Sequence, residues 1–310
     1  MKILIVGGSG YVGSALAQAI ITKKNDNDEV YILDIYPPPM LLRKKVTYIN
    51  LDLTNFNKVH KILKDIEFDV IIHLAAKIKG TPPDVMKVNV MGTVNLLEAI
   101  REKNFRLLIA ASTAAQLYRN AYYLPIDEKH PITPVTTYGF SKYLMEEVIN
   151  YYHKVYGLPT LIFRQTNVYG PSPNQKFTVI NKFIKQAIDS GEITIYGDGK
   201  QVRNFIHIKD LIEYYFRAIY HRNPKILIGE TINIGGPQEY SINDIAKIVA
   251  EAIFNELGKK VNIKHTPPSM PLTHEIYVFK ISLEKAKRLL NYKPKITVEE
   301  GIINLIRSLI

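Results

Sequence analysis

Short apolar runs alternate with longer amphipathic stretches through the first half of the chain. The apolar runs are KILIVG (2–7), VYILD (30–34), VTYINLD (46–52), DVIIHLAA (69–76), RLLIAAS (106–112) and PTLIFRQ (159–165). Because they are almost continuously apolar, they are typical of parallel strands buried on both faces. Residues 11–23, 55–65, 84–103 and 136–156 place apolar side chains at helical spacing, with Asp84 and Thr136 as expected N-caps. The pattern predicts an α/β fold built on a doubly wound parallel sheet.

The pattern changes after Gly170 and Pro171. Prolines and glycines cluster at 171–173, 197–199, 235–237 and 267–271, with short helical stretches between them. A single core stops growing near about 250–300 residues, and this chain has 310. We therefore expect a first domain at 1–168, to which the chain returns around 203–236. A second, smaller α/β lobe is expected from 169–202 and 237–310.

Composition narrows the class of protein. With 46% apolar and 22% charged residues, the chain is typical of a soluble globular protein. No apolar run approaches the ~20 residues of a membrane span, and the start MKILIVGG reaches glycines too early for a signal peptide. We therefore expect a cytoplasmic protein with no membrane partner. The absence of cysteine excludes disulfides, thiolate metal sites and cysteine nucleophiles.

The net charge of +11 favours ligands that carry phosphate, or nonspecific binding of nucleic acid. The lysines are scattered, however. Their densest clusters, at 41–46 and 103–106, do not interleave the stacking aromatic side chains of a nucleic-acid platform. We interpret these clusters as solvated surface and expect no nucleic-acid partner.

The stretch VGGSGYVGS follows the first predicted strand and opens the first predicted helix. Gly7, Gly10 and Gly13 allow a tight turn in which the helix N-terminus faces a pyrophosphate. Asp34, at the end of the second run, would accept hydrogen bonds from an adenosine ribose and repel a 2′-phosphate, which favours NAD over NADP. Asp52 follows the third run and would meet the adenine amino group. An ordinary glycine turn, with the aspartates as turn or capping residues, is the alternative.

Tyr138 and Lys142 lie four positions apart in YGFSK, so on a helix they share one face with Cβ atoms about 5–6 Å apart. A phenol with a pKa of about 10 is a poor base at neutral pH, but a nearby ammonium group and a cationic nicotinamide would stabilise the phenolate. The pair would then act as a general base. Ser112 and Thr113, at the carboxyl end of the preceding run, would relay or hold a proton. A surface helix and a capping pair are the alternatives.

Ordered motifs over nearly the whole chain resemble one family. The motifs are GGSGYVGS (7–14), HLAA (73–76), NVMGTVNLLEA (89–99), YGFSK (138–142), FRQTNVYGP (163–171), IYGDGKQVRNFIHIKDL (195–211) and EKAKRLLNYKPKITVEEGI (284–302). They are similar to those of the extended short-chain dehydrogenases/reductases, specifically the NAD-dependent nucleotide-sugar epimerases and dehydratases. Within this group they most resemble the UDP-glucose 4-epimerases. The resemblance implies a Rossmann domain that binds NAD and a second lobe that binds a nucleotide sugar, with a UDP-hexose expected.

The resemblance also implies roles for the catalytic residues. Tyr138 would remove the proton of the sugar 4-hydroxyl while hydride passes from C4 to NAD. Lys142 would also hold the nicotinamide ribose, and Thr113 would share the hydrogen bonding at O4. The cofactor contacts implied are Gly7, Gly10, Tyr11, Val12, Gly13, Asp34, Asp52, Leu53, Leu74, Ala75, Ala76, Asn89, Tyr138 and Lys142.

The substrate contacts implied by the resemblance are Asn167, Phe177, Val179 and Arg203. The guanidinium of Arg203 would bind the diphosphate, a charge match suited to its forked geometry. Most of the family has a second arginine for this purpose, whereas residues 271–287 offer His274 and Lys280. The identity of the nucleotide is therefore left open.

The residues that follow Thr113 favour one reaction within the family. The similar 4,6-dehydratases place an Asp-Glu pair there to eliminate water, and the decarboxylating branch places a glutamate in that region, whereas this chain has Ala114 and Ala115. We therefore expect C4 epimerisation through a transient 4-keto sugar. A 4,6-dehydratase, a 4-ketosugar reductase or dehydrogenase, and a noncatalytic NAD-binding protein are the alternatives. One extra residue before Tyr118 leaves the choice between Ser112 and Thr113 open.

A homodimer is also expected. The predicted helices at 84–103 and 136–156 carry apolar positions, some of which would pair across a two-fold axis, as in the family's dimers. These positions are Val85, Val88, Leu96, Leu144, Val148 and Tyr152.

Overall fold

The computed structural model describes residues 1–23, 28–118, 121–174, 178–267 and 277–309. Its centre is a seven-stranded sheet in the order β10-β6-β5-β4-β1-β2-β3, and all of its ladders are parallel. The strands are β1 (Lys2–Val6), β2 (Glu29–Asp34), β3 (Thr47–Asn50), β4 (Val70–His73), β5 (Leu107–Thr113), β6 (Thr160–Gln165) and β10 (Glu230–Ile234). The predicted doubly wound sheet is confirmed. Its strand order reverses between β1 and β4, where such sheets open a ligand crevice.

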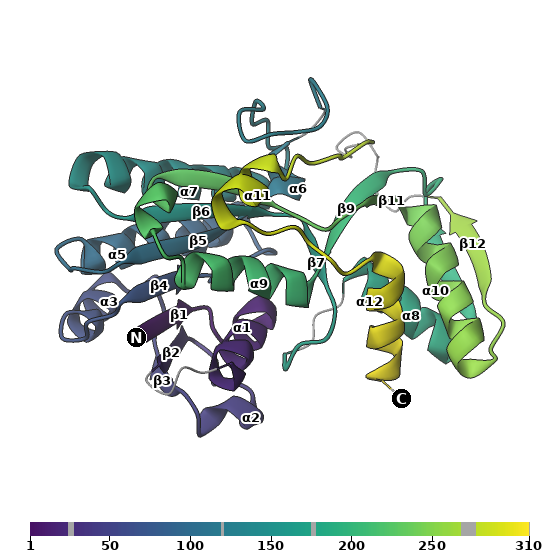
Figure 1. Ribbon diagram of the computed structural model, residues 1–310, viewed down its shortest axis with the longest axis horizontal. Coiled ribbons are helices and arrows are strands. Elements are labelled where there is room, and N and C mark those ends of the chain that lie inside the picture. The colour runs from purple at the N-terminus through teal and green to yellow at the C-terminus, as the bar shows by residue number, and fades with distance from the viewer. Residues whose placement is uncertain (24–27, 119–120, 175–177, 268–276, 310) are drawn as a thin grey trace.

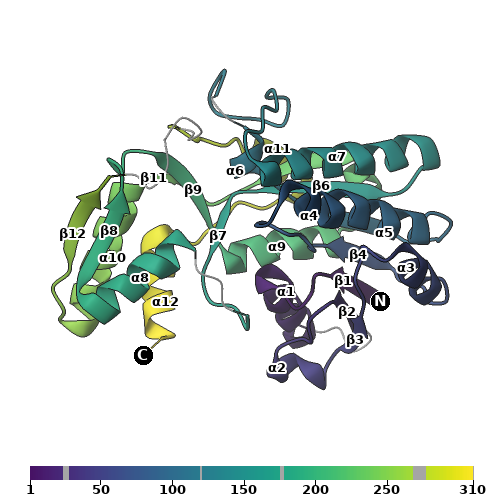
Figure 2. The same ribbon diagram turned by 180° about the vertical axis from the view of Figure 1, so that it is seen from behind.

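Helices cover both faces of this sheet (Figures 1 and 2). One face carries α1 (Tyr11–Thr22) and α9 (Ile208–Ile219), and the other carries α3 (Phe56–Leu63), α5 (Gly92–Ile100) and α7 (Thr137–Tyr156). In β1, Ile3 and Ile5 pack toward the first group, whereas Leu4 and Val6 pack toward the second. Because both faces are covered, the inner strands β1, β4 and β5 are almost continuously apolar.

A second group of elements lies at the opposite end of the molecule from α3 and α5 (Figure 1). Here α8 (Val179–Ser190), α10 (Ile242–Leu257) and α12 (Val298–Arg307) share a core with β8 (Glu192–Tyr196), which pairs with β12 (Asn262–Thr266). A three-stranded sheet of β11 (Glu239–Ser241), β9 (Val202–His207) and β7 (Asn167–Tyr169) lies between this group and the large sheet. The domain boundaries drawn from the sequence stay a prediction.

The remaining helical segments are short: α2 (Met40–Arg43), α4 (Pro82–Met86), a π-helical turn (Lys87–Met91), α6 (Ala114–Leu117), a 3₁₀ turn (Pro224–Leu227) and α11 (Glu284–Leu290). The expectation that Asp84 caps a helix is wrong. Thr81 is the N-cap, because Pro82 and Pro83 suit the first helical positions, and Asp84 donates its backbone N–H to the Thr81 hydroxyl. The predicted helix at 84–103 is also divided in two by the π-helical turn.

The long helix α7 begins as the sequence predicts. The Thr136 hydroxyl accepts the N–H of Gly139 at 3.0 Å, which confirms this N-cap. Of the apolar positions expected at a dimer surface, Val85, Leu96 and Tyr152 are buried within the chain. Because these three side chains pack into the protein's own core, they are not among the positions that could meet a second copy.

Across the described residues, no helix combines the length and the apolar character that crossing a bilayer requires.

Candidate active site

The turn between β1 and α1 needs glycine at two positions. Gly7 has a φ of +83°, and a Cβ there would lie 2.5 Å from the backbone N of Ala75; a Cβ on Gly13 would lie 2.4 Å from the carbonyl O of Gly7. The turn therefore packs directly against the end of β4 and against α1. Gly10 is the N-cap of α1 and has no side chain to bind the first-turn N–H groups, which leaves them available to an anion.

The Asp34 carboxylate lies beside this turn at the end of β2. Its two oxygens accept the backbone N–H groups of Ser9 and Tyr36, each at 3.1 Å. This fixes a negative charge at the crevice, as the NAD prediction requires. Asp52 accepts the N–H of Thr54 at 2.8 Å, whereas α3 is capped by Asn55.

A cavity of about 830 Å³ adjoins the turn, a size ordinary for small-molecule sites. Predicted cofactor contacts that line it are Gly7, Gly10, Asp34, Asp52, Leu53, Leu74, Ala75 and Ala76. Lining residues that the sequence analysis missed are Ser9, Leu33, Ile35, Tyr36, Pro37, Pro38, Pro39, Arg43, Leu51, Lys77, Val88, Pro173 and Asn174. The proline run at 37–39, separated from Asp34 by two residues, was a usable local signal. Pro173 and Asn174 come from a distant part of the chain and gave none.

Six predicted cofactor contacts are not among the residues that line this cavity: Tyr11, Val12, Gly13, Asn89, Tyr138 and Lys142. Asn89 is fully buried, and its amide binds the backbone N–H and carbonyl of Lys77 and the Ser141 hydroxyl. Ser141 in turn donates to the carbonyl of Tyr138 at 2.8 Å. The Asn89 side chain thus ties the cavity wall at Lys77 to the first turn of α7.

Lys142 is almost completely buried, with 2% of its surface exposed. Its Nζ donates to the carbonyl of Ala111 in β5 at 2.8 Å and contacts Met145 Sδ at 3.3 Å. Burial lowers the pKa of Lys142 to about 8, and the carboxylate of Glu146 opposes this shift. The amine therefore reaches from α7 to the carboxyl end of β5, next to Ser112 and Thr113.

Tyr138 is half-buried one turn before Lys142. Burial raises the pKa of Tyr138 to about 12. The spacing in the sequence predicts instead that the nearby amine makes this phenol more acidic. Burial acts against the expected lowering, so a phenolate at Tyr138 would require added positive charge nearby.

Ser112 and Thr113 are the last residues of β5. The Ser112 hydroxyl is buried with no hydrogen-bond partner among the described residues, whereas Thr113 keeps 8% of its surface exposed. Ala114 is buried and Ala115 is half-buried in the following helix. The nearby Glu146 is bound by Arg164 at 2.6 Å, and Glu128 accepts the N–H of Asn233 at 2.8 Å.

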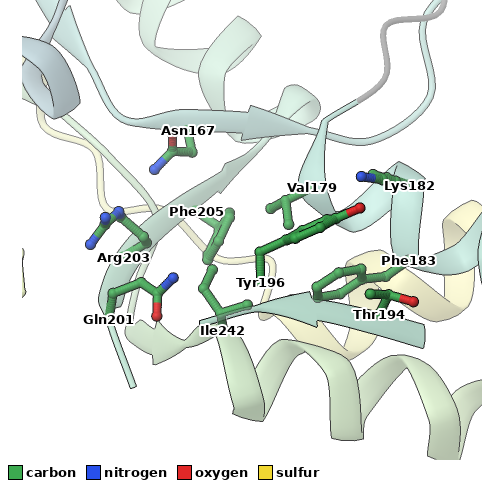
Figure 3. Close-up of a pocket in the computed structure, with 10 residues that line it drawn as sticks. All are labelled: Asn167, Val179, Lys182, Phe183, Thr194, Tyr196, Gln201, Arg203, Phe205 and Ile242. Atoms are coloured by element: carbon green, nitrogen blue, oxygen red, sulfur yellow. The ribbon is translucent and has the colours of Figure 1, made fainter. Parts of the chain in front are cut away.

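A second cavity, of about 300 Å³, lies between β9 and α8 (Figure 3). Its lining residues are Asn167, Val179, Lys182, Phe183, Thr194, Tyr196, Gln201, Arg203, Phe205 and Ile242. Three predicted substrate contacts, Asn167, Val179 and Arg203, are therefore brought together, whereas Phe177 lies outside the described residues. Arg203 lies at one end and Lys182 at the other, with Tyr196 between them (Figure 3). Lys182 and Tyr196 were missed, although Tyr196 belongs to a quoted motif.

Replacing Gly7 with alanine is expected to weaken NAD binding more than about 100-fold, or about 2.8 kcal/mol. The new methyl group would meet the Ala75 backbone and distort the turn. The matched control is Gly258→Ala, because Gly258 also has a positive φ, +66°, but faces open space. Calorimetric NAD titration of both variants, with thermal unfolding to confirm folding, checks this. Equal NAD affinities in the two folded variants would contradict it.

The chain matches the family described as NAD dependent epimerase/dehydratase over residues 3–235. It is 33% identical to a Methanocaldococcus jannaschii protein named "Putative UDP-glucose 4-epimerase", over 97% of this chain and 95% of that protein. UDP-glucuronic acid decarboxylase 3 of Arabidopsis thaliana is 29% identical, over 97% of this chain and 87% of its own length.

A solved structure shares both the fold and this level of identity. The UDP-glucuronic acid 4-epimerase from Bacillus cereus, in complex with UDP-glucuronic acid and NAD, gives a TM-score of 0.85 at 29% identity and covers 100% of both chains. The family match extends over most of the chain, and the glycine turn, Asp34 and the adjoining cavity fit NAD. This chain is therefore an enzyme of the NAD dependent epimerase/dehydratase family, with NAD as its cofactor.

Proposed function

We propose that this enzyme is a nucleotide-sugar 4-epimerase of the UDP-glucose/UDP-galactose type, which acts through a transient 4-keto sugar. The observation that carries the proposal is the spacing of Tyr138 and Lys142 by one turn of α7, with the Lys142 amine at the carboxyl end of β5 and alanine at 114 and 115. Oxidation at C4 and its reversal need a base at the hydroxyl. Elimination of water would also need an acid and a base next to Thr113, where this chain has methyl groups.

NAD, when bound, accepts hydride from the sugar and returns it. The residues of the chain manage the proton and the position of the sugar. Tyr138 Oη takes the proton of the 4-hydroxyl as the C4–H bond breaks, and returns it to the oxygen on reduction. Lys142 supplies a buried positive charge one turn away, which stabilises the phenolate. The hydroxyl of Thr113 or of Ser112 holds the sugar O4. The resemblance to the family favours Thr113.

The nucleotide end of the substrate is assigned to the cavity in Figure 3. Arg203 binds the diphosphate through its guanidinium, and Asn167 contacts the diphosphate or the sugar. Val179, Tyr196 and Phe205 surround the base with apolar and aromatic surface. This assignment places the diphosphate at the Arg203 end of the cavity and the base beside the ring of Tyr196 in its middle.

The alternatives are a nucleotide-sugar 4,6-dehydratase and a 4-ketosugar reductase or dehydrogenase of the same family. Incubation with UDP-glucose, UDP-galactose, UDP-hexuronates and UDP-N-acetylhexosamines, followed by separation of the sugars, distinguishes them. An epimerase converts one C4 epimer into the other with no net NADH. Loss of water, or one NADH formed or consumed per turnover, would instead identify an alternative, and no conversion of any substrate would remove the proposal.

We also propose that the chain is a cytoplasmic homodimer. Phe140, Tyr151 and Val155 recur along one side of α7 and expose 45%, 52% and 55% of their surfaces. A second copy would cover this apolar stripe.

Val155→Glu is therefore expected to halve the mass seen in sedimentation, from twice 35.4 kDa to the mass of one chain. The reason is that a carboxylate would be buried at the interface without a partner. A wild-type protein that sediments as one chain at micromolar concentration would contradict the homodimer.

A further inference from the structure

Residues 170–174, here called the strap, run from the end of β7 to the turn between β1 and α1. Both ribbon views show the chain after β7 passing beside α1 (Figures 1 and 2). The Tyr11 hydroxyl donates to the carbonyl of Gly170 at 2.7 Å, and Ser172 Oγ donates to the carbonyl of Tyr11 at 2.6 Å. Asn174 Nδ2 donates to the carbonyl of Ser9 at 2.7 Å. The strap therefore binds the glycine turn at three points.

These bonds hold peptide groups of the glycine turn, which faces the cavity that fits NAD. In a trans peptide the carbonyl and the N–H point in opposite directions, so fixing one fixes the other. Ser172 holds the Tyr11 carbonyl and thereby aims the N–H of Val12, in the first turn of α1. Asn174 holds the Ser9 carbonyl on the other side of Gly10. With this bond, the N–H, hydroxyl and carbonyl of Ser9 all have partners.

The same stretch of chain reaches both cavities. Asn167, three residues before the strap, lines the cavity of Figure 3, whereas Pro173 and Asn174 line the cavity beside the glycine turn. Between them, Tyr169 is fully buried and donates to the carbonyl of Thr297 at 3.1 Å. Ser172 is also buried, and its hydroxyl lies 3.2 Å from that of Ser14 in α1. Asn167 and the strap therefore belong to one anchored segment.

We propose that Ser172 and Asn174 are positioning residues for NAD, which hold the glycine turn in its binding shape from the substrate side of the cleft. NAD retention then depends on the strap, and a nucleotide beside Asn167 slows NAD release. The second consequence rests on the proposed function, because it needs the neighbouring cavity to bind a nucleotide.

The first test is NAD binding by Asn174→Ala in the full chain without nucleotide. Loss of one such hydrogen bond is expected to raise the NAD dissociation constant and release rate roughly 3- to 10-fold. The matched control is Asn243→Ala, because the Asn243 amide also donates to a distant carbonyl, that of Asp198, at 2.9 Å. This control should bind NAD like the wild type. Unchanged NAD binding in folded Asn174→Ala, or equal weakening in both variants, overturns the proposal.

The second test uses UDP as the probe. Saturating UDP should slow NAD release from the wild type and tighten NAD binding. NAD should tighten UDP binding by the same factor as UDP tightens NAD binding, because coupling between two binding equilibria is reciprocal. In Ser172→Ala this factor should fall toward one, while UDP binding to the NAD-free protein stays unchanged. A merely structural defect would not remove the coupling selectively.

The two proposals fail in different ways. A wild-type protein that does not bind UDP counts against the proposed function, and the NAD measurements on Asn174→Ala still decide the role of the strap. If UDP binds but leaves NAD release unchanged, or if Ser172→Ala keeps the full coupling, the link through the strap is wrong.

Discussion

Tyr138→Phe is expected to lower kcat about 10²- to 10⁴-fold while leaving NAD binding nearly unchanged, because the substitution removes the base and keeps the ring. The pH dependence should change with it. The base works only when deprotonated, and burial holds the pKa of Tyr138 near 12 in the protein without ligands. The wild-type rate should therefore rise with pH until the base of the loaded enzyme is deprotonated. The residual rate of the variant should lack this rise.

Epimerisation assays across pH, with NAD affinity measured in parallel, check this result. Tyr143→Phe is the matched control, because Tyr143 lies on the same helix and is half-buried. Its side chain packs against a small apolar cluster that includes Tyr118 and Phe279. It should keep wild-type activity. If Tyr138→Phe retained a tenth or more of the wild-type rate, Tyr138 would not be the base.

Lys142→Met is expected to lose at least about 100-fold in turnover and yet to unfold less readily at pH 7. The pKa of Lys142 is about 8, against an ordinary 10.5, because burial makes its charged form unfavourable in the folded chain. At about 1.4 kcal/mol per pKa unit the charge destabilises the fold by about 3 kcal/mol below pH 8. Replacing Lys142 also removes its hydrogen bond to Ala111, which costs about 1 kcal/mol. The net increase expected in the free energy of unfolding is therefore about 2 kcal/mol.

The sign of the pH dependence follows from the direction of this shift. Between pH 8 and 10.5 the Lys142 amine is protonated in the unfolded chain but not in the folded chain. This group therefore makes the wild-type protein more stable as the pH rises through that range. The advantage of Lys142→Met in denaturant unfolding should therefore shrink over that window. Lys154→Met, an exposed lysine on the same helix, should change neither activity nor stability. A Lys142→Met variant that is less stable at pH 7 would refute this prediction.

The large sheet was predictable because its strands are buried on both faces, which leaves a continuous apolar signal in the sequence. The same holds for α7, with Thr136 at its start and an amphipathic pattern behind it. Asp84 was a weaker case, because a proline pair directly before it set the helix start at Thr81. Val85 and Leu96 show a different limit: an apolar residue on a helix is equally consistent with a core and with an interface.

At the candidate site, residues marked by a motif or a characteristic spacing were found, whereas Asn174, which no local pattern marks, was missed. Gly7 and Asp34 belong to one strand-helix-strand unit, so their spacing carries the signal. Asn174 reaches the same turn only through the folded chain. The direction of the Tyr138 pKa shift also depended on burial, which a one-turn spacing to Lys142 does not reveal.

In the proposed reaction, C4 of the sugar is oxidised and reduced again at the same carbon, with NAD held throughout. UDP-glucose carrying deuterium at C4 tests it most directly, with the product analysed by mass spectrometry and NMR. A 4-epimerase should form UDP-galactose that keeps its deuterium at C4, with no accumulation of NADH. Deuterium lost to solvent, or NADH formed in proportion to product, would contradict it.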